Sequence, residues 1–183
     1  MTFDDAAKQP AGVPLKPTRP VLLVEDEKND VLFFKTALVK IQSPLPLQVL
    51  TDGESAWEYL TGVESTLRLP RPSLILLDLN LPKRSGLEIL TSLKAHSEFR
   101  SIPVIVLTSS TVQEDIDAVY ALGADFYLLK PFTFHSTMEL VQAISAYWSA
   151  LSEDPDAVGA DPTLHKLRKL AEVGSNGPAP TER

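Results

Sequence analysis

The sequence contains no cysteine. The lack of thiols excludes disulfides, thiolate metal sites and cysteine nucleophiles, and it fits a reducing compartment. Residues 1–20 contain no apolar core of signal-peptide length, and no later run approaches a membrane span. Basic residues are the minority, with 17 Lys and Arg against 24 Asp and Glu and a formal net charge of −7. We therefore expect a cytoplasmic protein with no membrane contact and no nucleic-acid partner, since phosphate binding needs a basic face.

The remaining composition is that of an ordinary globular chain. It has 183 residues, 44% of them hydrophobic and 22% charged, which is enough to bury one core. We predict a disordered N-terminal arm over residues 1–19, which are polar and rich in proline, and one domain over residues 20–151. Residues 152–183 are expected to form a tail with one short helix over residues 162–173.

Apolar runs alternate with stretches of helical periodicity along the predicted domain. Strands are expected at residues 21–24, 47–51, 74–78, 102–107 and 126–129. Helical spacing follows them in residues 31–41, 55–60, 87–96, 116–120 and 140–151. Asn29 or Asp30 can cap the first helix, and part of the acidic run before it is a solvated helix start. This alternation predicts a parallel sheet with helices on both faces, joined by right-handed crossovers.

The segment Leu74–Asp78 is the centre of this pattern. It shows no polar alternation until its last residue, which is typical of a strand buried on both faces. A carboxylate at the end of such a strand lies at the sheet edge where open α/β folds bind ligands. Pro82 keeps the chain from continuing as sheet. The strand thus brings the Asp78 side chain to a surface crevice.

Polar side chains also follow the neighbouring strands. Glu25 and Asp26 follow the first strand, Thr108 ends the fourth and Lys130 follows the fifth. The carboxyl ends of parallel strands share one edge, so these groups are expected to converge on Asp78. Clustered carboxylates repel one another unless a cation offsets them, and oxygen ligands suit Mg²⁺. A metal, an ammonium and a hydroxyl around one carboxylate form a site for a phosphoryl group.

These residues, in this order, resemble the receiver domains of two-component response regulators. The resemblance covers Val21 to Leu151 and implies a flavodoxin-like, doubly wound (βα)5 fold, whose five-stranded parallel sheet has the order 2-1-3-4-5. A narrower resemblance, from the run Asp78–Lys83, the Ile116–Tyr120 helix and Trp148, is to single-domain regulators paired with phytochrome-type sensor histidine kinases. The motifs that carry the resemblance are Val24-Glu25-Asp26, Leu76-Leu77-Asp78-Leu79-Asn80-Leu81-Pro82, Gly86, Val106-Leu107-Thr108-Ser109, Gly123-Ala124 and Tyr127-Leu128-Leu129-Lys130-Pro131.

The resemblance implies a role for each acidic residue. Asp78 would be the phosphoacceptor, taking a phosphoryl group from a histidine of the kinase. Asp26, Asp78 and the backbone carbonyl of Asn80 would bind Mg²⁺ directly, and Glu25 would bind it through water. Aspartate is also common in place of Glu25, whose longer side chain shifts its carboxylate relative to the ion.

The resemblance also implies a switch. Lys130 would pair with the phosphoryl oxygens, and Thr108 would hydrogen-bond one of them. Tyr127 would turn inward when Thr108 moves and reshape the face around the fourth helix, fifth strand and fifth helix. Receivers commonly pair through this face, so a homodimer is an expected assembly. The Lys130–Pro131 peptide bond is expected to be cis, which the X–Pro amide permits.

Three functions remain open. Roughly 30 residues follow the last predicted helix of the domain, too few for a helix-turn-helix output domain, which favours a stand-alone regulator. Such a protein is no enzyme beyond slow self-phosphorylation from small donors and autodephosphorylation. A phosphatase with an aspartyl-phosphate intermediate is less compatible, because Asn80 stands where such enzymes carry a second aspartate. A receiver-like binding module that works without phosphate is the third.

Overall fold

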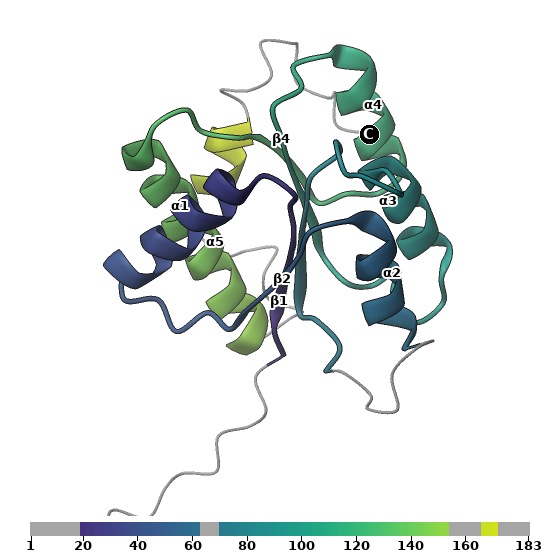
Figure 1. Cartoon of the computed structure of the whole chain (residues 1–183), viewed down its shortest axis with the longest axis horizontal. Coiled ribbons are helices and arrows are strands. Elements are labelled where there is room, and N and C mark those ends of the chain that lie inside the picture. Colours follow the sequence, from purple (N-terminus) through teal and green to yellow (C-terminus); the bar gives the residue numbers. More distant parts are fainter. Residues whose placement is uncertain (1–18, 63–69, 154–165, 172–183) are drawn as a thin grey trace, which may run out of the picture.

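The computed structural model describes residues 19–62, 70–153 and 166–171. The strands are β1 (Val21–Val24), β2 (Leu47–Leu50), β3 (Leu74–Leu77), β4 (Val104–Thr108) and β5 (Phe126–Leu129). The helices are α1 (Lys28–Lys40), α2 (Gly53–Thr61), α3 (Gly86–Ala95), α4 (Gln113–Ala121) and α5 (Phe134–Glu153). The strands form one parallel sheet in the order β2-β1-β3-β4-β5, which confirms the predicted fold and strand order. Helices α1 and α5 cover one face, and α2, α3 and α4 cover the other (Figure 1).

Successive side chains of the central strands enter two separate hydrophobic clusters. In β3, Leu74 and Leu76 belong to the cluster under α1 and α5, whereas Ile75 and Leu77 belong to the cluster under the other three helices. All four side chains are fully buried, as expected for a strand covered on both faces. Backbone pairing with β1 on one side and β4 on the other sets the register of β3 and with it the position of the residue that follows.

Several element boundaries differ from those expected. Helix α1 begins at Lys28 and is capped by Glu27, whose side chain accepts a hydrogen bond from the Asn29 N–H at 3.2 Å, so the expected cap at residue 29 or 30 is wrong. Helix α2 begins two residues earlier than expected because Asp52 caps it. Strand β4 begins at Val104, after a proline that has no N–H to donate to the sheet.

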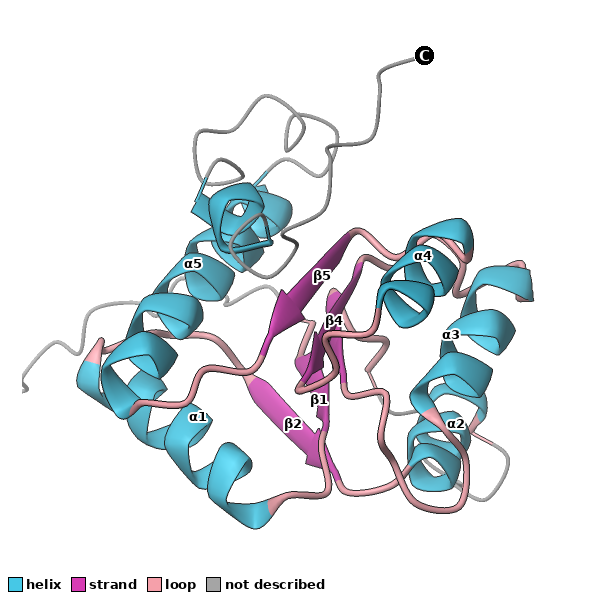
Figure 2. Cartoon of the chain, turned by 90° about the horizontal axis from the view of Figure 1, so that it is seen from above, coloured by secondary structure: helices cyan, strands magenta, loops and turns pink. Residues whose placement is uncertain are grey.

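Residues 166–171 are helical and lie on the side of the sheet covered by α1 and α5, where Figure 1 draws them in yellow; Figure 2 shows that this is toward the β5 edge. Leu167 is completely buried in the cluster under α1 and α5. Lys166 Nζ donates to Gln142 Oε1 on α5 at 3.2 Å. The expected arm before residue 19, and residues 162–165, 172 and 173 of the expected tail helix, lie outside the described residues.

The peptide bond between Lys130 and Pro131 is trans, since the described residues contain no cis peptide bond. The expectation of a cis bond is therefore wrong. The trans form of an X–Pro amide is intrinsically favoured by about 0.5–1 kcal/mol, and this loop leads into α5 without the cis isomer. Among the described residues, no helix is both long and apolar enough to cross a membrane.

Candidate functional site

The carboxyl edge of the sheet brings the predicted side chains together. The Asp78 N–H donates to the Val24 carbonyl at 3.1 Å, which continues the pairing of β3 with β1 and sets Asp78 beside Glu25. The Lys130 N–H donates to the Thr108 carbonyl at 2.9 Å, which continues the pairing of β5 with β4. Backbone pairing thus brings Glu25, Asp78 and Lys130 to one edge, although they lie far apart in the sequence.

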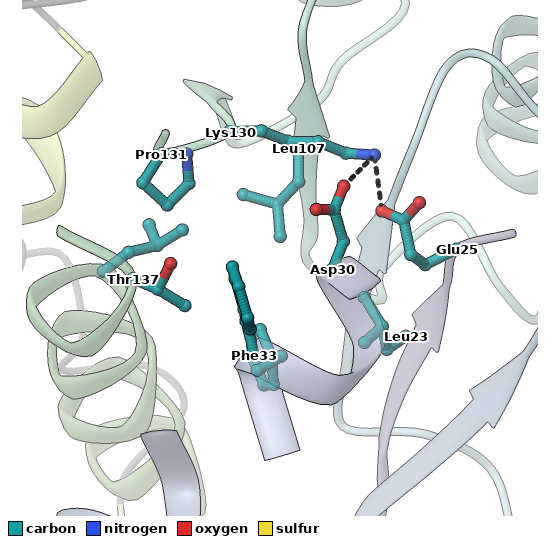
Figure 3. Close-up of a pocket in the computed structure, with 10 residues that line it drawn as sticks. Leu23, Glu25, Asp30, Phe33, Leu107, Lys130, Pro131 and Thr137 are labelled. Atoms are coloured by element: carbon teal, nitrogen blue, oxygen red, sulfur yellow. Dashed lines mark ion pairs between the residues drawn. The ribbon is translucent and has the colours of Figure 1, made fainter. Parts of the chain in front are cut away.

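The Lys130 ammonium lies among three carboxylates. Its Nζ is 2.6 Å from Asp78 Oδ2, 2.7 Å from Glu25 Oε2 and 3.0 Å from Asp30 Oδ2. Figure 3 shows the contacts with Glu25 and Asp30 at the polar end of a small pocket between α1 and α5, which Phe33 also lines. Two of the acceptors are predicted from the sequence, whereas Asp30, in the first turn of α1, is expected only as a possible helix cap within a partly solvated acidic run. Its place in the acidic run four residues after Asp26 was the one available signal.

Burial and charge set the protonation of this cluster. Burial raises the pKa of the Glu25 carboxyl to about 7, although the hydrogen bond and the charge of Lys130 oppose this. Burial alone would lower the pKa of the Lys130 ammonium, but its hydrogen bonds to Asp78 and Glu25 and their charges outweigh burial and raise it. Lys130 is therefore a permanent cation in this site, and it offsets part of the repulsion among the carboxylates.

The same edge offers ligands for a divalent cation. Carboxylate oxygens of Glu25, Asp26 and Asp78 all lie within 4.8 Å of one another. Glu25 and Asp78 are buried, while Asp26 is exposed and leaves the cluster open to solvent. An all-oxygen donor set with two or three carboxylates suits a hard ion such as Mg²⁺, which keeps several waters. The Asn80 N–H donates to Asp78 Oδ1 at 3.2 Å, so the loop that carries Asn80 folds back toward the cluster.

Gly86 allows the chain to pass close to the back of Asp78. A Cβ added at this position would lie 2.1 Å from the Asp78 carbonyl oxygen, a distance that no side chain can occupy. The Gly86 N–H donates to the Leu79 carbonyl at 3.0 Å, which closes the base of the loop. The glycine of the motif is thus needed for close packing behind Asp78.

Thr108 and Tyr127 meet at the loop after β4. The Thr108 side chain is fully buried, and its hydroxyl accepts a hydrogen bond from the Ser110 N–H at 3.3 Å. Tyr127 is 4% exposed, and its hydroxyl donates to the Ser110 carbonyl at 2.9 Å. Burial raises the pKa of the Tyr127 phenol, so this hydroxyl stays a donor near neutral pH. The predicted switch residues are therefore joined through Ser110, with Tyr127 turned inward.

Comparison with known proteins gives one family and several similar proteins. The chain matches the family described as the response regulator receiver domain over residues 21–144. It is 38% identical to response regulator Rcp1 of Synechocystis sp. over 132 residues, which cover 72% of this chain and 90% of that protein.

Two solved structures superimpose on the fold. The phosphorylated cyanobacterial phytochrome response regulator RcpA gives a TM-score of 0.68 at 34% identity, with 72% of this chain and 94% of the other covered. The Mn²⁺-bound form of response regulator Rcp1 gives a TM-score of 0.66 at 38% identity, with 71% of this chain and 94% of the other covered.

Proposed function

The chain belongs to the receiver domain family of response regulators, and from this premise we propose that it is a stand-alone regulator whose Asp78 accepts a phosphoryl group from a sensor histidine kinase. The observation that carries the proposal is the contact of Lys130 Nζ with Asp78 Oδ2 at 2.6 Å, beside the three clustered carboxylates. It unites a nucleophile, a fixed cation and a cation-binding cluster in one crevice. The similarity to Rcp1 over 90% of that protein supports the stand-alone form.

The proposed transfer is a single displacement at phosphorus. An Asp78 carboxylate oxygen forms the new bond to phosphorus while the bond from phosphorus to the donor's histidine nitrogen breaks, leaving an acyl phosphate. The Lys130 ammonium is already in contact with the nucleophile and would follow the negative charge onto the phosphoryl oxygens. The Thr108 hydroxyl, which at present accepts from the Ser110 N–H, would donate its proton to one of those oxygens. The phosphoryl group stays attached to Asp78 until the acyl phosphate hydrolyses, so the proposed role is regulatory, with at most slow autodephosphorylation.

Mg²⁺ fits the donor set beside the nucleophile. Glu25, Asp26 and Asp78 would supply carboxylate oxygens, Glu25 through water, and Asn80 would supply its backbone carbonyl. When bound, the ion would offset the negative charge that gathers on the carboxylates and the phosphoryl group. The family comparison supports this, because one similar protein, Rcp1, has been solved in a Mn²⁺-bound form.

The partner we propose is a phytochrome-type sensor histidine kinase in the cytoplasm. RcpA is described as a phytochrome response regulator, and it matches 72% of this chain at 34% identity. The output surface would be the α4–β5–α5 face, where a homodimer could form. Its state is coupled to the site through Tyr127, whose N–H donates to the Tyr120 hydroxyl of α4 at 3.3 Å.

Phosphorylation of Asp78 is directly testable. We expect the full-length chain to take up label from a radiolabelled small acyl phosphate in the presence of Mg²⁺, and the label to be released by hydroxylamine. Asp78→Asn should abolish labelling, whereas Asp117→Asn, an exposed residue of α4, should label like the wild type. Equal labelling of Asp78→Asn, or repeated turnover of a phosphomonoester, would overturn the proposal.

A further inference from the structure

The loop between β3 and α3 (residues 78–85) is attached to the first turn of α2. Asp52, which caps α2, is buried, and its Oδ1 accepts from the Ser55 N–H at 2.8 Å. Its Oδ2 accepts from the Ser55 hydroxyl at 2.9 Å and from Lys83 Nζ at 3.0 Å. The Lys83 side chain is 62% exposed, so water could solvate its ammonium group instead, yet the ammonium contacts Asp52. The buried Asp52 carboxylate therefore joins the start of α2 to the loop.

Close backbone contact reinforces this attachment. A Cβ added to Gly53 would lie 2.0 Å from the Arg84 carbonyl oxygen and 2.8 Å from its carbonyl carbon. The atoms in the way are backbone, so no side-chain rotation would relieve the clash. The Gly53 N–H also points to the Pro82 carbonyl, at 3.4 Å. The loop therefore lies directly on the glycine at the start of α2.

The backbone of the loop has an unusual conformation at Lys83, and the side chain of Arg84 holds the loop against α2 and α3. Lys83 has φ +66°, in the left-handed region that non-glycine residues avoid, and it is one of two non-glycine residues with positive φ in the described part of the chain. Arg84 stacks its guanidinium 4.7 Å from the centre of the Trp57 ring of α2 and also donates to the Ser92 hydroxyl of α3. A strained turn persists where its surroundings determine it, and here α2 supplies those contacts. We call Asp52, Gly53, Lys83 and Arg84 together the α2 clamp.

The loop that the α2 clamp holds carries Asp78 of the carboxylate cluster and the neighbouring Asn80. Asp78 and Asn80 lie at its start, and the Asn80 N–H contacts Asp78 Oδ1 at 3.2 Å. The loop is closed at its base by the Gly86–Leu79 hydrogen bond and fixed at its tip by the clamp. Asn80 is thus constrained from both sides by contacts outside the cluster.

We propose that the α2 clamp positions the Asn80 carbonyl for the divalent cation and so sets the cation affinity of the site. This inference rests on the proposed function, in which that cation is bound. Asp52, Gly53 and Lys83 are positioning residues, because each acts through the loop and none is among the clustered carboxylates. Partners that orient metal ligands from outside the coordination shell typically change metal affinity by about 10- to 100-fold.

Charge makes the test discriminating. Lys83→Met removes a positive charge from the neighbourhood of a cation site, so electrostatics alone would strengthen cation binding. Release of the clamp would weaken it, by about tenfold. Gly53→Ala should weaken it similarly with no change in charge, and Lys83→Arg should restore near wild-type affinity. Glu54→Gln, at an exposed position of the same helical turn, removes a negative charge without touching the loop, so it measures how much one charge in this turn changes binding, with the sign opposite to that of Lys83→Met.

The experiment is a calorimetric titration of each full-length variant with Mn²⁺, with the thermal midpoint measured in parallel. We expect Lys83→Met and Gly53→Ala to bind Mn²⁺ about tenfold more weakly than the wild type, and the double variant to bind no more weakly than the worse single one. Unchanged or tighter binding by Lys83→Met would overturn the clamp, even if its thermal midpoint falls. A wild-type chain that binds no Mn²⁺ would instead overturn the proposed function.

Discussion

At the scale of single residues, Lys130 is the cation that lets three carboxylates share one crevice. Its ammonium contacts Asp78, Glu25 and Asp30 and is 17% exposed. Removing one member of a buried ion cluster leaves the others uncompensated, which typically destabilises a protein by about 3–5 kcal/mol. We therefore expect Lys130 to stabilise the folded chain, and in the proposed transfer it would also neutralise charge on the phosphoryl group.

Lys130→Met should consequently unfold more easily than the wild type, by about 3 kcal/mol in urea titrations without divalent cations. Added Mg²⁺ should restore more stability to this variant than to the wild type, because the ion replaces the missing positive charge. Lys35→Met, at an exposed position of α1, is the matched control and should change little. An equal loss in both variants would show that Lys130 does not neutralise the cluster.

Asp52 gives a residue-scale prediction for pH. Burial would raise the pKa of its carboxyl, but the hydrogen bonds from Ser55 and Lys83 outweigh burial and hold it below the usual 3.8. Because the pKa is lower in the folded chain than in the unfolded chain, the stabilisation is complete above about pH 4 and is lost as the pH falls through the folded value. The difference in unfolding free energy between wild type and Asp52→Asn should therefore be constant from pH 8 to 5 and shrink below pH 4. A difference that grows on acidification would have the wrong sign.

The contrast between Asp78 and Asp30 shows how far residues could be assigned from sequence. Asp78 was predictable, because a buried apolar strand fixes where its last carboxylate lies. Asp30 was not, because its contact with Lys130 depends on how α1 packs beside the end of β5, 100 residues later. Helical periodicity identifies which side of a helix is buried, but it does not say which distant residue its first turn will meet.

At the scale of elements, strands were easier to predict than helix starts. Continuous apolar runs such as Leu74–Leu77 have few alternatives once turn signals bound them. The start of a helix depends on which of several neighbouring polar residues occupies the N-cap position, and glutamate is not a preferred N-cap residue. The preference for polar cap residues therefore favoured Asn29 or Asp30 over Glu27. Loop geometry, including the left-handed Lys83, depended on tertiary contacts and was beyond prediction.

The link between β5 and the loop after β4 is testable at this scale. Tyr127→Phe removes the hydroxyl that donates to the Ser110 carbonyl and should destabilise the chain by only about 1 kcal/mol. Amide hydrogen exchange should accelerate in residues 109–112 and remain unchanged in β1 and β3, since only the loop loses a contact. Tyr59→Phe, whose hydroxyl bonds the Pro70 carbonyl far from this loop, is the control. Unchanged exchange at residues 109–112 would show that Tyr127 does not hold the loop.

At the scale of the whole molecule, the C-terminal segment joins the core. The spacing of apolar residues predicts a helix over residues 162–173, and residues 166–171 are helical. Spacing does not predict where such a helix packs, because periodicity does not identify the element that it contacts. The structure seats residues 166–171 on the side of the sheet covered by α1 and α5, toward the β5 edge and next to the face proposed for dimerisation (Figure 2). Its single completely buried side chain, Leu167, makes the docking measurable.

Leu167→Ala should lower the free energy of unfolding by about 2–4 kcal/mol, the range for deleting a buried leucine side chain from a core. Leu32→Ala, at a side chain that is 58% exposed on α1, removes the same atoms and should change it by less than about 1 kcal/mol. Urea unfolding of the two full-length variants measures the difference. Equal stabilities would mean that residues 166–171 do not stay docked in solution. A selective loss would make this segment part of the folded unit, so that any dimer on the α4–β5–α5 face must form around it or displace it.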